Sequence, residues 1–299
     1  MVSGPCGGMG VEAGCIGIVG LGLIGGSIGL DLRSHGLEVQ GLVHRQQTAD
    51  RALTRGLVSA VSTDPSCLQG CDLVVLALPI PALLQPDPAL VAALPRNAVI
   101  TDVGSVKQPV LDRWKPLHPR FVASHPMAGT ALAGVEAGQR DLFRGRPWIA
   151  TPDAGTEPEA LARVQGLATQ LGSQWFTAAA SQHDQAVALI SHMPVLVSAA
   201  LLRTAGDERD PEIRQLSQAL ASSGFADTSR IGAGNPDLGV AMASSNREAM
   251  LKALAAYRWS LEQLEDAVLQ NNWDQLRREL SRTKDLRPGF LQNSSELSC

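Results

Sequence analysis

The sequence predicts an α/β fold in which a doubly wound, mostly parallel sheet is followed by an all-helical domain. Short apolar runs without alternation, such as residues 72–78, recur in the first part between helical patterns, as expected for parallel strands buried on both faces. A glycine-rich turn follows the first of these runs, within residues 16–27. From Ser181 onward helical periodicity replaces the apolar runs, so we place the helical domain there.

Residues 16–27 read IGIVGLGLIGGS, in which Gly20, Gly22 and Gly25 form G-x-G-x-x-G. In this fingerprint the first glycine permits a tight turn, the second lets a pyrophosphate approach the backbone, and the third allows close helix–strand packing. A strand before it, a helix after it and a second strand at residues 37–43 complete a βαβ unit. We therefore predict a Rossmann-type dinucleotide site, with the first helical residues Leu23 and Ile24 facing the diphosphate. A purely structural turn is the alternative.

The end of the second strand, residues 42–47, reads LVHRQQ. NAD enzymes place an acidic residue at this point, whereas an arginine accommodates the 2′-phosphate of NADP. Here His44 and Arg45 stand at that point, and no acid lies between Glu38 and Asp50. We predict NADP as the cofactor, with its 2′-phosphate near His44, Arg45 and Gln46; an ordinary exposed arginine is the alternative.

Further strands end at the edge of the sheet where ligands bind in such folds. The run at residues 72–78 ends at Leu78 and Pro79, and the run at residues 98–102 ends at Asp102, so we place these three side chains at the cofactor. A short strand from Phe121 delivers His125 to the same edge. Strands at residues 148–150 and 174–177, flanking a helix at residues 158–171, complete the domain near Ala178.

The second part reads as helices at residues 184–202, interrupted at Pro194, at 211–223, ended by Gly224, and at 239–270 and 272–286. The long segment carries apolar residues at alternating spacings of four and three, which is an a/d seam. Packing within the domain is one explanation, and a homodimer formed through this helix is the one we predict. The seam consists of Met250, Leu254, Tyr257, Leu261, Leu264 and Val268.

The overall organisation and composition narrow the function classes. We expect a disordered tail over residues 1–14, in which Met9 is an alternative start, a nucleotide-binding domain over 15–178, a helical domain over 179–286 and a loose tail over 287–299.

The 299 residues are 44% hydrophobic with a net charge of −4, which speaks against disorder and a nucleic-acid partner. Five cysteines without C-x-x-C spacing suit reduced thiols in a cytoplasmic protein. The histidine spacing gives no metal site, and no run appears long enough for a membrane span.

Four further stretches complete a pattern: DVGSVK at residues 102–107, HPMAGT at 125–130, HDQAVALISHMP at 183–194 and GFADTSR at 224–230. With the fingerprint they resemble the prephenate and arogenate dehydrogenases of tyrosine biosynthesis, from about residue 16 to residue 246. The sequence resembles the cyanobacterial type of arogenate dehydrogenase in particular, which also carries Arg-Gln-Gln after the second strand and Asp-Thr-Ser-Arg in the helical domain. The resemblance implies an oxidative decarboxylation, in which a cyclohexadienol loses hydride to NADP and CO2 leaves, so that the ring becomes aromatic.

The resemblance also implies roles for single residues. It assigns the catalytic base to His125, whose imidazole titrates near neutral pH. Ser105 matches a serine that hydrogen-bonds the substrate hydroxyl and the histidine, although an N-cap for the helix near Lys107 is an equally good reading. Arg230 matches the arginine that holds a substrate carboxylate, with Asp227 orienting it or forming a simple surface ion pair. Three more residues match positions near the substrate: Thr130, His183 and His192.

Two departures from the family pattern bear on the substrate. Val195 stands where many prephenate-type relatives carry histidine, and residues 234–239 stand where many carry tryptophan. Valine offers no donor to the anionic pyruvyl side chain of prephenate, whereas the zwitterionic side chain of arogenate partly neutralises itself, so we predict arogenate. The alternatives are a prephenate dehydrogenase, an NADP hydroxyacid-type dehydrogenase and a non-catalytic NADP sensor. A hydroxyacid-type enzyme would use a lysine of the helical domain as its acid/base, but Lys252 lies in an apparent core-and-interface helix.

Overall fold

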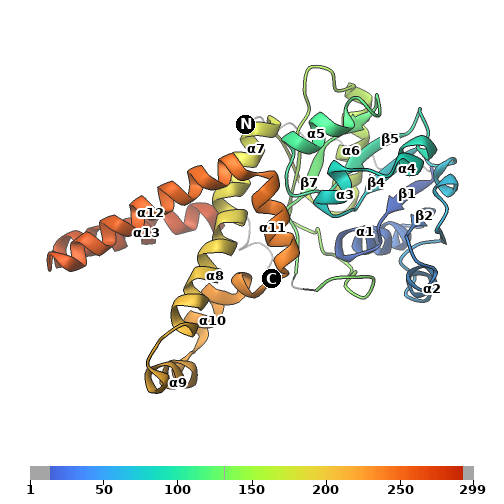
Figure 1. Ribbon diagram of the computed structural model, residues 1–299. Coiled ribbons are helices and arrows are strands. Elements are labelled where there is room, and N and C mark those ends of the chain that lie inside the picture. Colours follow the sequence, from blue (N-terminus) through green and yellow to red (C-terminus); the bar gives the residue numbers. More distant parts are fainter. Residues whose placement is uncertain (1–13, 131, 292–299) are drawn as a thin grey trace. The chain divides into compact units, whose positions relative to one another are not determined.

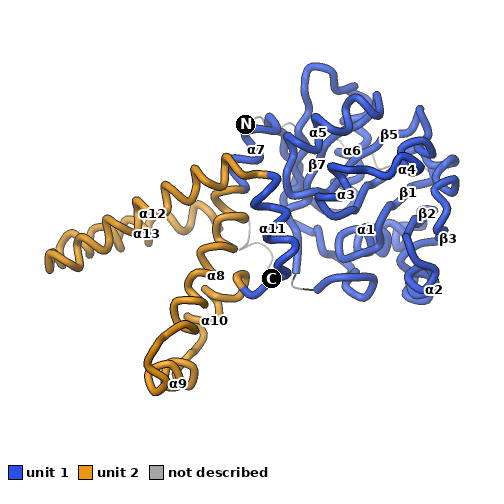
Figure 2. Tube along the Cα trace, viewed as in Figure 1, with its two compact units in different colours: residues 1–187, 233–245 blue, residues 188–232, 246–299 orange. Residues whose placement is uncertain are grey.

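The computed structural model describes residues 14–130 and 132–291 (Figure 1). They form two compact units (Figure 2), which we call unit 1 and unit 2. Unit 1 comprises the chain through Val187 together with Ala233–Ser245, and unit 2 comprises Ala188–Gly232 and the chain from Asn246 onward. An α/β sheet domain followed by a helical domain confirms the predicted fold class.

Unit 1 is built on a six-stranded parallel sheet of order β3-β2-β1-β4-β5-β6. All residues of β1, β4 and β5 are buried, which explains why these strands read as unbroken apolar runs. The sequence analysis missed β3, a three-residue edge strand that is only partly buried and carries no such run. The strands are β1 (Ile16–Val19), β2 (Val39–Leu42), β3 (Ala60–Ser62), β4 (Leu73–Leu76), β5 (Val99–Asp102) and β6 (Phe121–Val122).

A separate three-stranded sheet carries His125. The chain leaves the parallel sheet at Ala123, whose carbonyl accepts a hydrogen bond from Thr151 N at 2.9 Å. Beyond this point β7 (Ser124–Pro126) pairs antiparallel with β8 (Pro147–Ala150), and β8 pairs parallel with β9 (Gln174–Thr177). The predicted strand that delivers His125 is therefore divided between two sheets.

The helices of unit 1 pack on these sheets around a core that includes Ile18, Ile28, Leu32 and Trp148, all completely buried. Several begin with proline at the first or second position, where its missing N–H costs nothing. They are α1 (Leu23–Ser34), α2 (Gln46–Thr54), the 3₁₀ turn η1 (Pro65–Leu68), α3 (Ile80–Leu84), α4 (Pro88–Ala93), α5 (Gln108–Trp114), α6 (Pro158–Gln170), α7 (Ala180–Val187) and α11 (Pro236–Ser245).

Unit 2 is helical, and three of its helix boundaries differ from the prediction. The expected interruption near Pro194 is a π turn, and it fits a proline that cannot donate an amide hydrogen bond. One predicted helix ends at Leu220, before Gly224, and another is broken at Asn246. The elements are η2 (Ala188–His192), α8 (Met193–Gly206), α9 (Pro211–Leu220), α10 (Ser223–Ser229), η3 (Arg230–Ala233), α12 (Arg247–Leu269) and α13 (Trp273–Leu291).

The segment boundaries also differ from the expected ones. Unit 1 extends to Val187 rather than ending near Ala178, because α7 is anchored to α5 by hydrogen bonds described below. The chain is helical through Leu291, where a loose tail was expected from residue 287. The expected tails at residues 1–13 and 292–299 lie outside the described residues.

The helical run Ala180–Gly206 is longer and more apolar than the sequence analysis recognised. It has 27 residues, and an 18-residue stretch within it has a mean hydropathy of 1.8, so by length and composition alone it could cross a membrane. Four of its polar side chains are buried and hydrogen-bonded: His183, Asp184, His192 and Ser198. One helix of this kind is weak evidence for a membrane span, because a core helix of a soluble protein can have the same length and composition.

Candidate active site

Two of the three fingerprint glycines, Gly20 and Gly25, occupy positions that demand glycine, and the third, Gly22, leaves the backbone open. Gly20 has a φ of +91°, and a Cβ there would lie 2.4 Å from the carbonyl oxygen of Ala77. A Cβ at Gly25 would lie 2.0 Å from the carbonyl oxygen of Gly20, so α1 can pack this closely on β1 only without a side chain. A Cβ at Gly22 would meet nothing within 4 Å, so the backbone is open to a ligand at this one point. This arrangement fits a bound diphosphate.

The N-terminus of α1 is suited to an anion. Gly22 is the N-cap, and no side chain caps the helix. The first amides of an α-helix have no partner within the helix, and they lie at the positive end of its dipole. Leu23 and Ile24 supply such amides beside Gly22, as predicted for a dinucleotide diphosphate.

A cavity of about 580 Å³ opens in unit 1 at the carboxyl ends of β1 and β2. It brings Gly20 and Gly22 together with His44, Arg45 and Leu78, five of the predicted cofactor residues. Within the described residues no carboxylate forms an ion pair with Arg45. The lining also includes side chains that the sequence analysis did not select, because isolated hydroxyls and carboxylates carry no motif: Thr48, Thr63 and Asp87.

Six predicted cofactor residues do not lie in the lining of this cavity: Leu23, Ile24 and Gly25 of α1, and Gln46, Pro79 and Asp102. The Gln46 side chain turns along its own helix, where Nε2 donates to Asp50 Oδ1 at 2.8 Å. Pro79 is exposed and serves as the N-cap of α3. The predicted role of Gln46 at a 2′-phosphate is therefore not supported.

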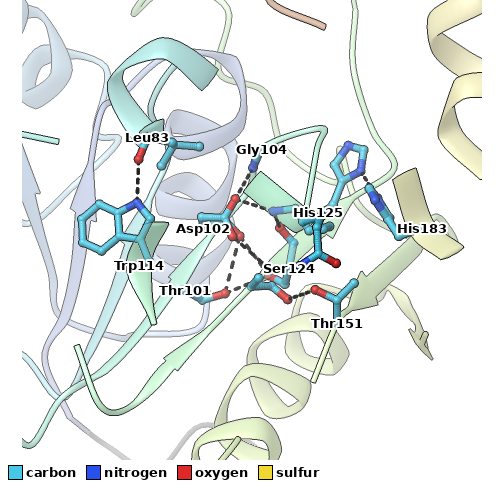
Figure 3. Close-up of polar contacts among 12 residues, drawn as sticks. Leu83, Thr101, Asp102, Gly104, Trp114, Ser124, His125, Thr151 and His183 are labelled. Carbon is cyan, nitrogen blue, oxygen red and sulfur yellow. Dashed lines mark hydrogen bonds and ion pairs between the residues drawn. The ribbon is translucent and has the colours of Figure 1, made fainter. Parts of the chain in front are cut away.

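Asp102 is a correction to the predicted cofactor contacts. Its carboxylate is completely buried and accepts hydrogen bonds from Gly104 N at 2.8 Å and Ser124 N at 3.2 Å, and it forms an ion pair with Lys107 (Figure 3). Burial raises the pKa of Asp102 and lowers the pKa of Lys107, and their mutual contact opposes both shifts. Because all of these partners belong to the protein, Asp102 holds the loop after β5 and does not face a cofactor.

Ser105, in that loop, has a buried Oγ with no hydrogen-bond partner among the residues that the structure describes. Buried hydroxyls are nearly always paired, so an unpaired one indicates a place for a ligand. The alternative role as an N-cap of α5 is excluded, because Asp184 takes that role. Its Oδ1 accepts from Lys107 N at 2.7 Å and its Oδ2 accepts from Gln108 N at 2.9 Å.

His125, in β7, is linked to α7 through a second histidine. Its Nδ1 lies 3.0 Å from Nε2 of His183 (Figure 3), and Nδ1 of His183 lies 2.8 Å from Oδ1 of Asp184. Both ring nitrogens of His183 are therefore engaged inside the protein, which leaves neither for a direct contact with substrate. Sequence reasoning missed Asp184, whose only signal was its place beside His183.

The Asp184 carboxylate is anionic at neutral pH. Burial raises its pKa, but hydrogen bonds from His183 and from the amides of Gln108 and Lys107 outweigh burial and hold the pKa below its usual value. The chain of contacts therefore runs from a fixed negative charge through one imidazole to the next.

In unit 2, His192 and Arg230 have very different surroundings. His192 is completely buried, with Nδ1 3.2 Å from Nδ2 of Asn246, so a structural role fits it better than the predicted substrate contact. Arg230 is exposed at the start of η3. Its turn is fixed by Ser198, whose Oγ donates to Thr228 O at 2.8 Å and accepts from Gly232 N at 2.9 Å.

Two other predicted substrate residues remain on the surface. Asp227 is exposed, and among the described residues no ion pair joins it to Arg230, so neither predicted arrangement of the two is present. Thr130 is exposed, and its Oγ1 accepts from Leu132 N at 3.2 Å. Neither side chain has a geometry that indicates its role.

Comparisons with known protein families cover most of the chain. Residues 28–176 match the model described as prephenate dehydrogenase, nucleotide-binding domain, and residues 179–282 match prephenate dehydrogenase, dimerization domain. The cyclohexadienyl dehydrogenase of Zymomonas mobilis is 31% identical over 267 residues, which is 87% of this chain and 90% of that protein.

Solved structures agree with this result. The arogenate dehydrogenase of Synechocystis is 41% identical with a TM-score of 0.77, covering 92% of this chain and 99% of that one. The prephenate dehydrogenase of A. aeolicus, in complex with hydroxyphenyl propionate and NAD+, is 28% identical with a TM-score of 0.86, covering 93% and 98%.

Proposed function

The chain belongs to the prephenate dehydrogenase family, and from this premise we propose that it is an NADP-dependent arogenate dehydrogenase that produces tyrosine. The observation that carries the dehydrogenase chemistry is His125, an imidazole held at one nitrogen and placed in the same unit as the dinucleotide cavity. Neither a sensor nor a binding protein needs a base that is held in this way.

In this proposal the chain supplies three groups to the reaction. His125 takes the proton of the substrate hydroxyl, and the unpaired Oγ of Ser105 hydrogen-bonds that hydroxyl. Arg230 binds a substrate carboxylate through its guanidinium. When bound, the cofactor supplies the nicotinamide that accepts the hydride, and loss of CO2 then leaves the ring aromatic.

The preference for NADP rests on Arg45. It lines the cavity at the end of β2 together with His44, and the family's dinucleotide fold would place the adenosine ribose there. A guanidinium without an ion-pair partner suits a 2′-phosphate, whereas NAD would leave it uncompensated. The A. aeolicus relative contains NAD+, so NAD is the second candidate cofactor.

The preference for arogenate rests on Val195 in α8, which is half-buried and offers no hydrogen bond. The lack of a hydrogen-bond partner costs an anionic pyruvyl side chain more binding free energy than it costs a zwitterionic side chain. The 41% identity to a protein named arogenate dehydrogenase supports the same choice. Prephenate is the second candidate, supported by the prephenate dehydrogenase of Bacillus subtilis, which is 28% identical over 280 residues.

One assay tests the substrate and the cofactor. The reduction of NADP and of NAD is followed with arogenate and with prephenate, and kcat/KM is compared for the four combinations. We expect the highest value for arogenate with NADP. A higher value for prephenate overturns the substrate assignment, and a higher value for NAD overturns the cofactor assignment.

We also propose a homodimer formed through unit 2. One part of the predicted seam packs inside unit 2 and another part is available to a second subunit. Met250 is 4% exposed, whereas Leu261 and Val268 are 49% and 51% exposed. The family model over this region is described as a dimerization domain, which supports the proposal. Other exposed apolar side chains of unit 2 include Leu189, Ile190, Leu251, Trp259, Leu269, Trp273 and Leu280. A cytoplasmic location is proposed as well, supported by the free thiols of Cys15, Cys67 and Cys71.

A further inference from the structure

We propose that Asp184 and His183 are positioning residues that fix the tautomer of His125. They also hold the His125 ring in a fixed position relative to the loop that carries Ser105. The inference rests on the proposed function, because it assigns a task to residues beside the base. Neither residue needs to touch the substrate for this task.

The tautomer follows from the order of the contacts. An ionised carboxylate can only accept hydrogen bonds, so Nδ1 of His183, 2.8 Å from Asp184 Oδ1, carries a proton. In a neutral imidazole the other nitrogen is then the acceptor. Nε2 of His183 therefore accepts from His125 Nδ1 at 3.0 Å. With its proton on Nδ1, neutral His125 has its lone pair on Nε2, the nitrogen that can take a proton from a hydroxyl.

The same carboxylate fixes the loop that carries Ser105. Asp184 accepts hydrogen bonds from the amides of Lys107 and Gln108, at 2.7 and 2.9 Å, where the loop enters α5. On the other side, Nζ of Lys107 donates to the carbonyl of Ser124, the residue before His125, at 2.7 Å. The base and the hydroxyl of Ser105 are therefore held by a shared set of contacts.

The arrangement also favours the charge that develops during the reaction. When Nε2 of His125 takes the hydroxyl proton, the O–H bond breaks, an N–H bond forms and the imidazole becomes a cation. The negative charge of Asp184, transmitted through His183, stabilises this cation and raises the basicity of His125. The hydride leaves with its electron pair for the nicotinamide, so no further oxidant is required.

The first experiment is kinetic and uses Asp184→Asn in the full chain. We expect kcat with arogenate to fall by about 10- to 10³-fold, as for a base that loses its tautomer and its counter-charge. The KM values change little, because no substrate contact is removed. The acidic limb of the pH profile moves to lower pH, since His125 becomes less basic. A role in helix capping alone would lower stability without moving this limb.

Variants of His183 separate the link to His125 from the cap on α5. His183→Asn can still donate to Asp184 but no longer reaches His125, whereas His183→Gln can still accept from His125 but no longer contacts Asp184. Both leave Asp184 to cap α5, so the proposal stays testable if Asp184→Asn does not fold. We expect both to move the acidic limb, with the larger fall in kcat for His183→Asn.

Asp210→Asn is the matched control. Asp210 caps α9 in unit 2 in the same way, accepting from Glu212 N at 2.9 Å, and its cap belongs to a helix that carries none of the residues proposed to act with His125. It should leave kcat and the pH profile unchanged. A kcat of Asp184→Asn that matches this control, with an unmoved limb, overturns the proposal.

A second measurement is independent of turnover. Histidine ¹⁵N spectra of the unmodified protein should show His125 with its proton on Nδ1, and Asp184→Asn should lower the pH at which His125 titrates. A proton on Nε2 overturns the proposal. If neither arogenate nor prephenate is oxidised, the proposed function fails. The spectra still show whether Asp184 and His183 fix the tautomer of His125.

Discussion

Lys107 Nζ donates a hydrogen bond to the carbonyl oxygen of Ser124 at 2.7 Å, deep inside unit 1 where neither side chain is exposed. The same ammonium forms the ion pair with Asp102. The end of β5 and the start of β7 are thereby joined directly beneath the residue proposed as the base.

Removing the Lys107 cation should destabilise unit 1. Lys107→Met leaves a buried carboxylate without its partner, which costs about 3–5 kcal/mol of unfolding free energy. The pKa of Asp102, already raised by burial, then lacks the opposing effect of Lys107. The folded state keeps a proton that the unfolded state releases, so stability declines as pH rises above the normal range of a carboxyl group.

Urea unfolding of Lys107→Met at pH 5 and pH 8 measures both effects. The double variant Lys107→Met with Asp102→Asn serves as the control, because it removes the charge that was left unpaired. It should recover part of the stability and lose the pH dependence. Equal stability of the single variant at both pH values contradicts the argument.

Arg45 should distinguish the two cofactors. Arg45→Ala removes charge-assisted hydrogen bonds worth about 1.5–3 kcal/mol, so NADP affinity should fall roughly ten- to a hundredfold while NAD affinity stays nearly constant. Fluorescence titration of both cofactors measures this. Gln46→Ala is the control in the same loop, because its side chain bonds Asp50 instead of facing the cavity. Equal weakening of NADP and NAD by Arg45→Ala means that the arginine only supports the loop.

His125 should be needed for turnover and not for binding. His125→Asn removes the base and should lower kcat by about 10²–10⁴-fold. Titration with NADP should give the affinity of the unmodified protein, because the cofactor cavity does not include this side chain. Turnover close to that of the unmodified enzyme removes His125 from the reaction.

Exposed seam residues should control assembly. Leu261→Glu with Val268→Glu places charges on two half-exposed apolar positions of α12, so the predicted homodimer should dissociate while unit 1 keeps its cofactor affinity. Light scattering after size exclusion gives the mass. Glu262→Gln, an exposed neighbour, is the control and should remain dimeric. An unmodified protein that is already monomeric at micromolar concentration ends the proposal.

Val195 should influence the choice of substrate. Val195→His introduces a donor at a half-buried position of α8, so the use of prephenate should improve relative to arogenate. The measurement is the ratio of kcat/KM for the two substrates with NADP. Val195→Leu keeps the position apolar and controls for size. A ratio that the histidine leaves unchanged shows that position 195 does not read the side chain.

The sequence predicted those features of the fold that depend on the backbone and burial of residues close together in the chain. The glycines of the fingerprint could be assigned because each has a backbone reason that shows in the spacing alone. The strands β1, β4 and β5 could be assigned because burial on both faces removes polar residues from them. β3 could not, since an exposed edge strand of three residues has no such pattern.

Contacts between distant segments could not be predicted in this way. His183 was selected by resemblance, but its position 58 residues from His125 gives no sign that the two rings meet. Asp102 was placed at the cofactor because it ends a strand, and only packing reveals Lys107 beside it. The break between α11 and α12 lies at Asn246, whose amide contacts the buried His192, a pairing that no periodicity encodes.

Gly232 limits how this protein can vary. A Cβ there would lie 2.4 Å from the backbone nitrogen of Ala199 and 2.5 Å from the carbonyl carbon of Ser198, and neither is a flexible side chain that could give way. Any replacement would push η3, with Arg230, away from α8. Genetic drift at position 232 should therefore be strongly restricted, although this residue has no side chain with which to bind anything. The substitutions that unit 2 tolerates are thus limited by the close approach of the η3 and α8 backbones, as well as by the chemistry of the groups that bind the substrate.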